Sequence, residues 1–326
     1  MGDVERFQFY KLRAPTVGPR RFVAVAFFVI VALAQPARAI GWAPTDFLIG
    51  GGPSFTNKIG VFDSELNFMG LLDSSFVTVA GMDFDSSGHL VAVASAMREV
   101  RVYDASGAQV GGFIRSDDLL GTSADLKVTP SGSYVVATQN FGGGDGAREF
   151  APDGTFVRQY GTGGIRAVAV IPGNRLWIGG LSSSMISVFD LDSGALLDTI
   201  TITGPSGFRS MTYSANTNTV LADSGGSIWE LDFSGNVLHN FTAPGVHGLG
   251  AAVRGTNGDV FATDSGQSLF RWHADGSFVG STLTSDTLGF PYGIVWAGNI
   301  PEPASGVLVV LLSMPVLGKR LRRRVI

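Results

Sequence analysis

A turn motif that returns about every forty residues constrains this chain more than any other feature. Its clearest copy is Val102-Tyr103-Asp104-Ala105-Ser106-Gly107, in which an apolar strand meets a polar turn that ends in glycine. The corresponding turn glycines stand at positions 107, 154, 194, 235 and 276, at intervals of 47, 40, 41 and 41 residues. A weaker copy runs from Phe62-Asp63 to Asn67. A fixed period near forty indicates one supersecondary unit copied along the chain.

Each unit is predicted to contain four short strands joined by three turns. In the first complete unit, Gly81 to Phe84 leads to a turn at Gly88, and three more apolar segments follow before residue 115. Continuous or alternating apolar residues predict the strands, and pairs such as Asp153-Gly154 supply the positive φ that tight turns require. No window shows the pattern of an amphipathic helix.

The two ends of the repeat array complete each other. Five units begin near residues 80, 124, 166, 209 and 249. Pro291 to Trp296 is predicted as an inner strand with no successor, whereas residues 46–72 supply outer strands with no inner one. Joining them makes a sixth unit and closes a ring, which removes exposed sheet edges. The chain is therefore predicted to be all-β, a six-bladed β-propeller closed by its N- and C-terminal strands.

One sequence motif connects the units to known repeats. Gly258-Asp259-Val260-Phe261-Ala262-Thr263-Asp264-Ser265-Gly266, followed by Leu269 to Trp272 and Asp275-Gly276, resembles the NHL and gluconolactonase-like propeller superfamily. The resemblance covers residues 46–298. It implies the fold, since propellers with other functions share such phrases.

The N-terminal residues 1–39 have the layout of a secretory signal peptide. A basic region ends at Arg20-Arg21, an uncharged apolar run spans Phe22 to Ala34, and Ala37 and Ala39 are the small residues that predict cleavage after Ala39. The alternative is an uncut membrane anchor, for which about 13 residues are short. The arginine pair suggests twin-arginine export, although its flanking residues match that signal poorly.

The C-terminal residues 301–326 form a third region. Pro301-Glu302-Pro303 precedes an apolar run from Gly306 to Gly318 and a basic tail, and this order resembles the PEP-CTERM sorting signal that exosortases read in Gram-negative bacteria. The basic tail consists of Lys319, Arg320, Arg322, Arg323 and Arg324. The resemblance implies a transmembrane helix with a cytoplasmic basic end, the export machinery and an exosortase as partners, and release to the cell surface or medium. The alternative is a tail anchor that is never cut.

The charge of the body, residues 40–300, excludes one class of partner. It carries twelve Lys and Arg against twenty-four acids. An acidic surface disfavours nucleic acid, whose phosphates demand a positive face. The chain has no cysteine, which excludes disulfides and thiolate metal sites.

Candidate ligand-binding residues come from the repeat register. One residue per unit should enter the inner strand at the mouth of the central channel, seven positions before the turn; these are Gly81, Asp125, Arg166 and Arg209, with Gly250 and Gly293 placed by analogy, and His247 and Tyr292 beside the last two. Asp125 is expected to hold Arg166, and the two arginines suit bidentate capture of carboxylates or sulfates. An acidic extracellular polysaccharide is therefore a candidate partner. The alternative is that both arginines only bond neighbouring loops.

Catalytic chemistry receives less support from the residues. A metal-assisted lactonase needs several converging carboxylates, and the predicted mouth offers one acid, so no metal, cofactor or catalytic residue is predicted. Asp83 and Asp85, which flank Phe84, are expected to solvate a strand and a loop. The leading hypothesis is an exported binding or scaffold module of the bacterial envelope or of the extracellular polymer matrix of biofilms. The alternative is a secreted propeller hydrolase or lyase acting on a lactone or polysaccharide.

Overall fold

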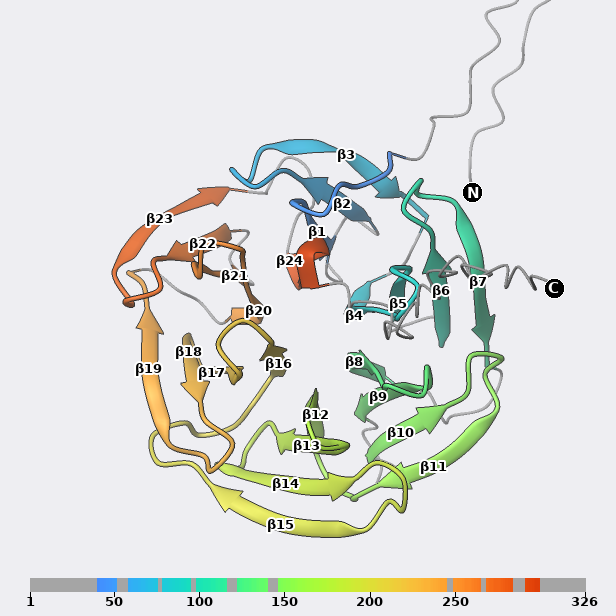
Figure 1. Cartoon of the computed structure of the whole chain (residues 1–326), viewed down its shortest axis with the longest axis vertical. Coiled ribbons are helices and arrows are strands. Elements are labelled where there is room, and N and C mark those ends of the chain that lie inside the picture. The colour runs from blue at the N-terminus through green and yellow to red at the C-terminus, as the bar shows by residue number, and fades with distance from the viewer. Residues whose placement is uncertain are drawn as a thin grey trace, which may run out of the picture. The chain divides into compact units, whose positions relative to one another are not determined.

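Six β-sheets surround a central axis in the structure of this protein, a computed structural model (Figure 1). The residues that the structure describes are 40–51, 58–75, 78–94, 98–115, 122–139, 146–244, 249–264, 268–283 and 291–299. Each sheet has four antiparallel strands, and one end strand of each sheet lies nearest the axis. The predicted all-β, six-bladed propeller is confirmed.

The blades are numbered 1 to 6 here, with strands given from the axis outward. Blade 1 contains β24 (Pro291–Trp296), β1 (Phe47–Gly51), β2 (Ile59–Phe62) and β3 (Phe68–Asp73), and blade 2 contains β4 (Val79–Phe84), β5 (Leu90–Ala94), β6 (Glu99–Tyr103) and β7 (Gln109–Ile114). Blade 3 contains β8 (Thr122–Val128), β9 (Tyr134–Gln139), β10 (Gly146–Phe150) and β11 (Phe156–Tyr160), and blade 4 contains β12 (Ile165–Ile171), β13 (Arg175–Gly180), β14 (Met185–Asp190) and β15 (Leu196–Thr201). Blade 5 contains β16 (Ser210–Ser214), β17 (Thr219–Ser224), β18 (Ser227–Leu231) and β19 (Val237–Thr242), and blade 6 contains β20 (Leu249–Arg254), β21 (Val260–Asp264), β22 (Ser268–Trp272) and β23 (Phe278–Leu283). A short 3-10 helix, Ala297–Asn299, follows β24.

Blade 1 closes the ring with strands from both ends of the chain, as the unpaired sequence segments predicted. β24 pairs antiparallel with β1, and Ile49 lies opposite Ile294. The pairing extends beyond the strands, since the Ala297 N–H donates to the Asp46 carbonyl at 2.9 Å. The segment before β1 also reaches blade 2, where the Trp42 N–H donates to the carbonyl of Ala105 at 3.2 Å.

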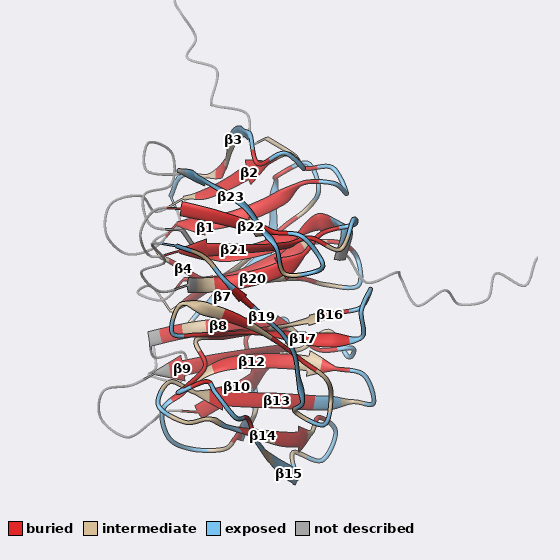
Figure 2. Ribbon diagram, turned by 90° about the vertical axis from the view of Figure 1, so that its left-hand side faces the viewer, coloured by how far each residue is buried: buried red, intermediate tan, exposed pale blue. Residues whose placement is uncertain are grey.

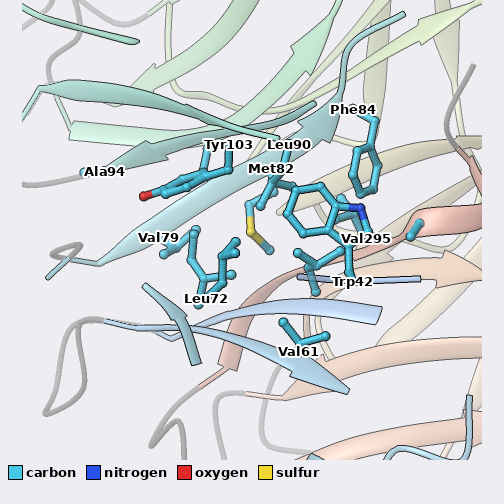
Figure 3. Close-up of a cluster of buried hydrophobic side chains, with 14 residues drawn as sticks. Trp42, Val61, Leu72, Val79, Met82, Phe84, Leu90, Ala94, Tyr103 and Val295 are labelled. Carbon is cyan, nitrogen blue, oxygen red and sulfur yellow. The ribbon is translucent and has the colours of Figure 1, made fainter. Parts of the chain in front are cut away.

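The hydrophobic core consists of layers between the blades. Six clusters of buried side chains lie one at each junction between neighbouring blades. Figure 3 shows the cluster between blades 1 and 2, where Val61 and Leu72 face Met82 and Tyr103. Both faces of a blade are covered, so every residue of β5 is buried. Figure 2 shows strands such as β13 and β21 coloured mostly as buried.

The turns between the third and fourth strands confirm the repeat. Gly107, Gly154, Gly194, Gly235 and Gly276 all have φ between 73° and 89°, in the left-handed region that glycine tolerates best. In blade 1 the same place is taken by Leu66, with φ of 65°. Leu66 is buried against Phe62 and Trp296 in the core between blades 1 and 6, so packing offsets the cost of its backbone conformation.

Candidate functional site

The central channel has two ends, and the predicted site residues belong to one of them. The inner strands β4, β8, β12, β16, β20 and β24 begin at what is called here the channel mouth and turn back at the hairpin end. Arg166 stands near the start of β12, and Arg209 directly precedes β16. Both side chains are partly buried.

The two arginines share a carboxyl that the sequence interpretation did not select. Asp223 in β17 is 1% exposed, and neither of its carboxylate oxygens has a hydrogen-bond partner in the described part of the chain. Burial raises the pKa of Asp223 well above its ordinary value, while Arg209 and Arg166 oppose that shift by their charge. The Arg209 N–H also donates to the Asp223 carbonyl at 3.0 Å. Asp223 therefore lies close enough to both predicted arginines for their charges to act on its carboxyl.

Asp264 in β21 repeats Asp223 in the next blade. Both aspartates pair with the start of their inner strands, Asp223 opposite Ser210 and Asp264 opposite Leu249. Oδ1 of Asp264 is also buried without a hydrogen-bond partner among the described residues, and its charge contributes to the raised pKa of Asp223. The signal was present in the sequence, because Asp264 belongs to the phrase that suggested NHL repeats and Ala222-Asp223-Ser224-Gly225 is a second copy of it.

Asp125 joins the inner strands of blades 3 and 4. Its Oδ1 accepts a hydrogen bond from Lys127 Nζ at 2.7 Å, and its Oδ2 accepts one from the Val168 N–H at 3.2 Å. Asp125 therefore binds the inner strand of the next blade, and its expected pairing with Arg166 stays a prediction. The innermost strand of each blade has one edge without a neighbouring strand, so a carboxylate that accepts from its N–H groups satisfies buried donors.

The strand pairing also moves Asp125 out of the predicted register. Leu126, Val168 and Met211 are equivalent, since each packs toward the preceding blade. On that alignment Arg166 and Arg209 are equivalent to each other, and Asp125 stands one residue further along its strand. The count from the turn failed because the inner hairpins differ in length: five residues lie between the paired Val128 and Tyr134, three between Ile171 and Arg175, and four between Ser214 and Thr219.

Asp83 makes the same kind of clamp between blades 2 and 3. Its Oδ1 accepts from the Phe84 N–H at 2.9 Å and its Oδ2 from the Val128 N–H at 2.8 Å. Burial raises the pKa of Asp83 to about 6, although Lys127 opposes the shift. The expectation that Asp83 solvates a strand is therefore wrong. Asp85 does stabilise a loop, since its Oδ1 accepts from the N–H groups of Ser87 and His89.

A pocket of about 380 Å³ lies at the hairpin end of the channel, and every inner strand contributes to it. Its charged lining residues are Asp83 and Lys127, and its polar ones are Ser86, Thr129, Thr212 and Tyr213. The remaining lining is apolar and consists of Met82, Phe84, Val128, Pro130, Val170, Ile171, Pro172, Ala215, Val253 and Val295. Figure 3 shows three of these lining residues, Met82, Phe84 and Val295, near Trp42 in the core between blades 1 and 2.

The histidines that the structure describes have acidic partners. The Nδ1 atoms of His89, His239 and His273 lie 3.1 Å from Asp85, 2.9 Å from Glu230 and 3.3 Å from Asp259, respectively. Within the described ranges, no group of three or more His, Cys, Asp or Glu residues is placed to hold a metal ion. Nor do those ranges contain a helix long and apolar enough to cross a membrane.

Several predicted site residues lie outside the described structure. The backbone of Tyr292 is part of β24, but its side chain is not described. His247, the cleavage residues Ala37 and Ala39, Pro301-Glu302-Pro303 and the basic tail fall in ranges that the structure does not describe.

Comparison with known proteins bears on the fold. No family model and no curated protein matches the chain. A protein of unknown function from Bacteroides caccae aligns with a TM-score of 0.58 and 14% identity, over 77% of this chain and 98% of that one. Virginiamycin B lyase from Staphylococcus aureus aligns with a TM-score of 0.54 and 16% identity, over 77% and 88%. A chain of a nidogen/laminin complex aligns with a TM-score of 0.62 and 14% identity, over 76% and 97%.

These proteins share the propeller fold. At identities of 14–16%, the likeness does not extend to the residues of a site. The neighbours include a lyase, a chain from a complex of two other proteins and a protein of unknown function, so the fold by itself does not select one activity.

Proposed function

We propose that this protein is an exported binding module of the envelope or extracellular polymer of a Gram-negative bacterium, and that its channel mouth binds the acidic groups of an extracellular polysaccharide. The observation that carries the proposal is that Arg166 and Arg209 stand at the start of neighbouring inner strands, near enough to the buried Asp223 for their charges to act on its carboxyl. Two arginines from neighbouring blades thus belong to the same end of the channel in a body that is acidic overall.

The electrostatics of the mouth favour an anion because burial favours the neutral form of Asp223. Because its pKa is raised, Asp223 neutralises the charges of Arg166 and Arg209 less than a fully ionised carboxylate would. Apolar surroundings of low dielectric focus such a local field even when the net charge of the protein has the opposite sign. A planar guanidinium group can donate two parallel hydrogen bonds to a carboxylate or sulfate.

The test is a titration of uronic-acid oligomers and of neutral oligomers of the same length into the purified protein. Arg166→Ala combined with Arg209→Ala should weaken binding of the acidic oligomers by about tenfold or more, and binding should weaken with added salt. Arg175→Ala is the matched control, since it removes an exposed arginine from the start of β13 at the hairpin end. Equal affinity in the native protein and the double variant would contradict the proposal.

The export part of the proposal depends on the two ends of the chain. The order of the Pro301-Glu302-Pro303 motif, the apolar run and the basic tail supports sorting by an exosortase after passage through the export machinery. The membrane helix would hold the protein only until processing, which would release it to the cell surface or medium. Intact-mass measurement of protein recovered outside the cell tests this, and a mass that includes Arg322-Arg323-Arg324 would overturn it.

A second candidate function, a secreted hydrolase or lyase for a lactone or polysaccharide, is favoured by Asp223 itself. A carboxyl that is buried, without a hydrogen-bond partner among the described residues and raised in pKa has the properties of a general acid. Turnover of lactone or polysaccharide panels that disappears in Asp223→Asn would favour this enzyme over the binding module.

A further inference from the structure

The pocket at the hairpin end contains a carboxylate, Asp83, that forms no direct ion pair within the protein's described residues. Lys127 Nζ donates to Asp125 Oδ1 at 2.7 Å and to the Leu126 carbonyl at 3.1 Å, so its ion pair is with Asp125. Among the described residues, Asp83 accepts hydrogen bonds only from the N–H groups of Phe84 and Val128. Of the three charged side chains in this group, Asp83 is therefore the one left without a direct counterion.

The oxygens of Asp83 retain the capacity to accept further hydrogen bonds. An ionised carboxylate has about four lone-pair positions, and the two backbone donors occupy one on each oxygen. Asp83 also lines the pocket, so these positions can meet a molecule that enters it. A ligand that brings N–H donors would complete the coordination of a charge that burial otherwise penalises.

The rest of the pocket lining determines which kind of molecule can carry these N–H donors. The lining from other blades includes apolar side chains, with Val170 from blade 4, Val253 from blade 6 and Val295 from blade 1. Phe84 and Tyr213 add aromatic side chains, which attract cations as well as apolar groups. The other polar groups of the lining are the hydroxyls of a serine, two threonines and Tyr213.

We propose that the hairpin end of the channel is a binding site for a small organic cation, in which an ammonium group meets the carboxylate of Asp83 and an apolar body fills the space between the inner strands. This site is separate from the channel mouth and does not depend on the function proposed there. An anion would face Asp83 without gaining Lys127, whose ammonium group is already bound to Asp125.

Three probes of similar size and shape but different charge test whether charge controls binding. The protein expressed from the full sequence is titrated by calorimetry with 2-phenylethylamine, 2-phenylethanol and phenylacetate. The amine should bind at least about tenfold more tightly than the alcohol, and phenylacetate should bind more weakly than either. The chemical shifts of the Phe84 and Val128 amides, which donate to Asp83, should change on addition of the amine.

Variants on opposite walls test the position of the site. Asp83→Asn should reduce amine affinity to that of the alcohol, and Val253→Trp should abolish binding of both by filling the pocket from β20 while leaving Asp83 in place. The Arg166→Ala, Arg209→Ala double variant should bind the amine as the native protein does. Asp104→Asn, which alters a partly exposed turn aspartate, is the control for loss of a carboxylate.

A pH titration of the native protein keeps the test independent of how the variants fold. The groups near Asp83 that titrate or carry charge are Lys127 and Asp125 on β8, with the Tyr213 phenol on β16; among the described lining residues, the other inner strands add no charged group. Because the pKa of Asp83 is about 6, amine affinity should fall as pH is lowered through about 6. Equal affinity for the amine and the alcohol, unchanged affinity in a folded Asp83→Asn variant, or affinity that does not fall at low pH would overturn the proposal, as would no binding of the amine.

Discussion

At the scale of single residues, the turns between third and fourth strands combine two local stabilising features. A glycine adopts positive φ at the end of each of five turns. In blades 2, 4 and 5 an aspartate at the start of the turn accepts hydrogen bonds from the turn's backbone, as Asp104 does from the N–H groups of Ser106 and Ala108. These contacts span at most four residues, so the motif can be recognised from the sequence alone.

Two of these glycines form a matched pair for mutation. Gly276→Ala introduces a Cβ with no atom within 4 Å, so only the left-handed backbone opposes it, and we expect a loss of about 1 kcal/mol. In Gly235→Ala the new Cβ would also clash with Cγ2 of Ile200, and we expect a loss of about 3 kcal/mol. Urea unfolding followed by fluorescence measures both. Equal losses would show that the contact with Ile200 relaxes freely.

At the scale of elements, position within the blade decides how much a strand contributes to the core. Inner strands such as β24 lie between two hydrophobic clusters, with Ile294 in one and Val295 in the other. The outermost strands have one open edge and expose much of their surface, including apolar residues such as Leu196 and Leu197 in β15. A truncation should therefore cost more in an inner strand than in an outer one.

Ile294 and Leu196 test this difference with side chains of equal size. Ile294 is 4% exposed, and Ile294→Ala should destabilise the protein by about 2–4 kcal/mol because a cavity opens where blade 1 meets blade 6. Leu196 is 57% exposed, and Leu196→Ala should change stability by less than about 0.5 kcal/mol. Chemical denaturation provides both values. A small effect at Ile294 would indicate that β24 is not needed to close the ring.

At the scale of the whole molecule, stability should be greatest at mildly acidic pH. Burial raises the pKa of Asp83 from 3.8 to about 6, so the stability linked to this carboxyl is fully present below about 3.8 and is lost as pH rises through about 6. Burial also raises the pKa of Asp125 and of Asp223. In contrast, hydrogen bonds from serine hydroxyls lower the pKa of the turn residues Asp104 and Asp275, whose contribution is lost as pH falls below their ordinary range.

The melting temperature should therefore rise as pH is lowered from about 7.5 to about 5 and fall below about 3.5. Calorimetry across this range measures the profile, and Asp83→Asn should flatten the rise between about pH 7 and about pH 5. A melting temperature that falls steadily from neutral pH to pH 5 would contradict the assignment of raised pKa values to the buried carboxyls.

The architecture was predictable from sequence to a greater extent than the sites. The turn glycines and the two unmatched end segments are local patterns, and together they predicted six blades closed through β1 and β24. Asp83 joins two blades by accepting a hydrogen bond from Val128, 45 residues away in the sequence, and no local pattern predicts that contact. The same holds for Asp223, because only the fold brings its carboxyl near enough for the charges of Arg166 and Arg209 to act on it. Inner hairpins of unequal length were enough to displace Asp125 from the predicted register.

The pairing of β1 with β24 has a consequence for the order of folding events. Phe47 pairs with Trp296, so the contact that closes the ring joins nearly the first and the last residues of the body. A chain that emerges from its N-terminus forms blades 2 to 6 while β1 still lacks its partner, since β24 is the last strand to be made. Closing so long a loop is slow, and partly assembled sheets expose edges that favour aggregation. We therefore expect a late kinetic step, during which the nascent propeller depends most on chaperones.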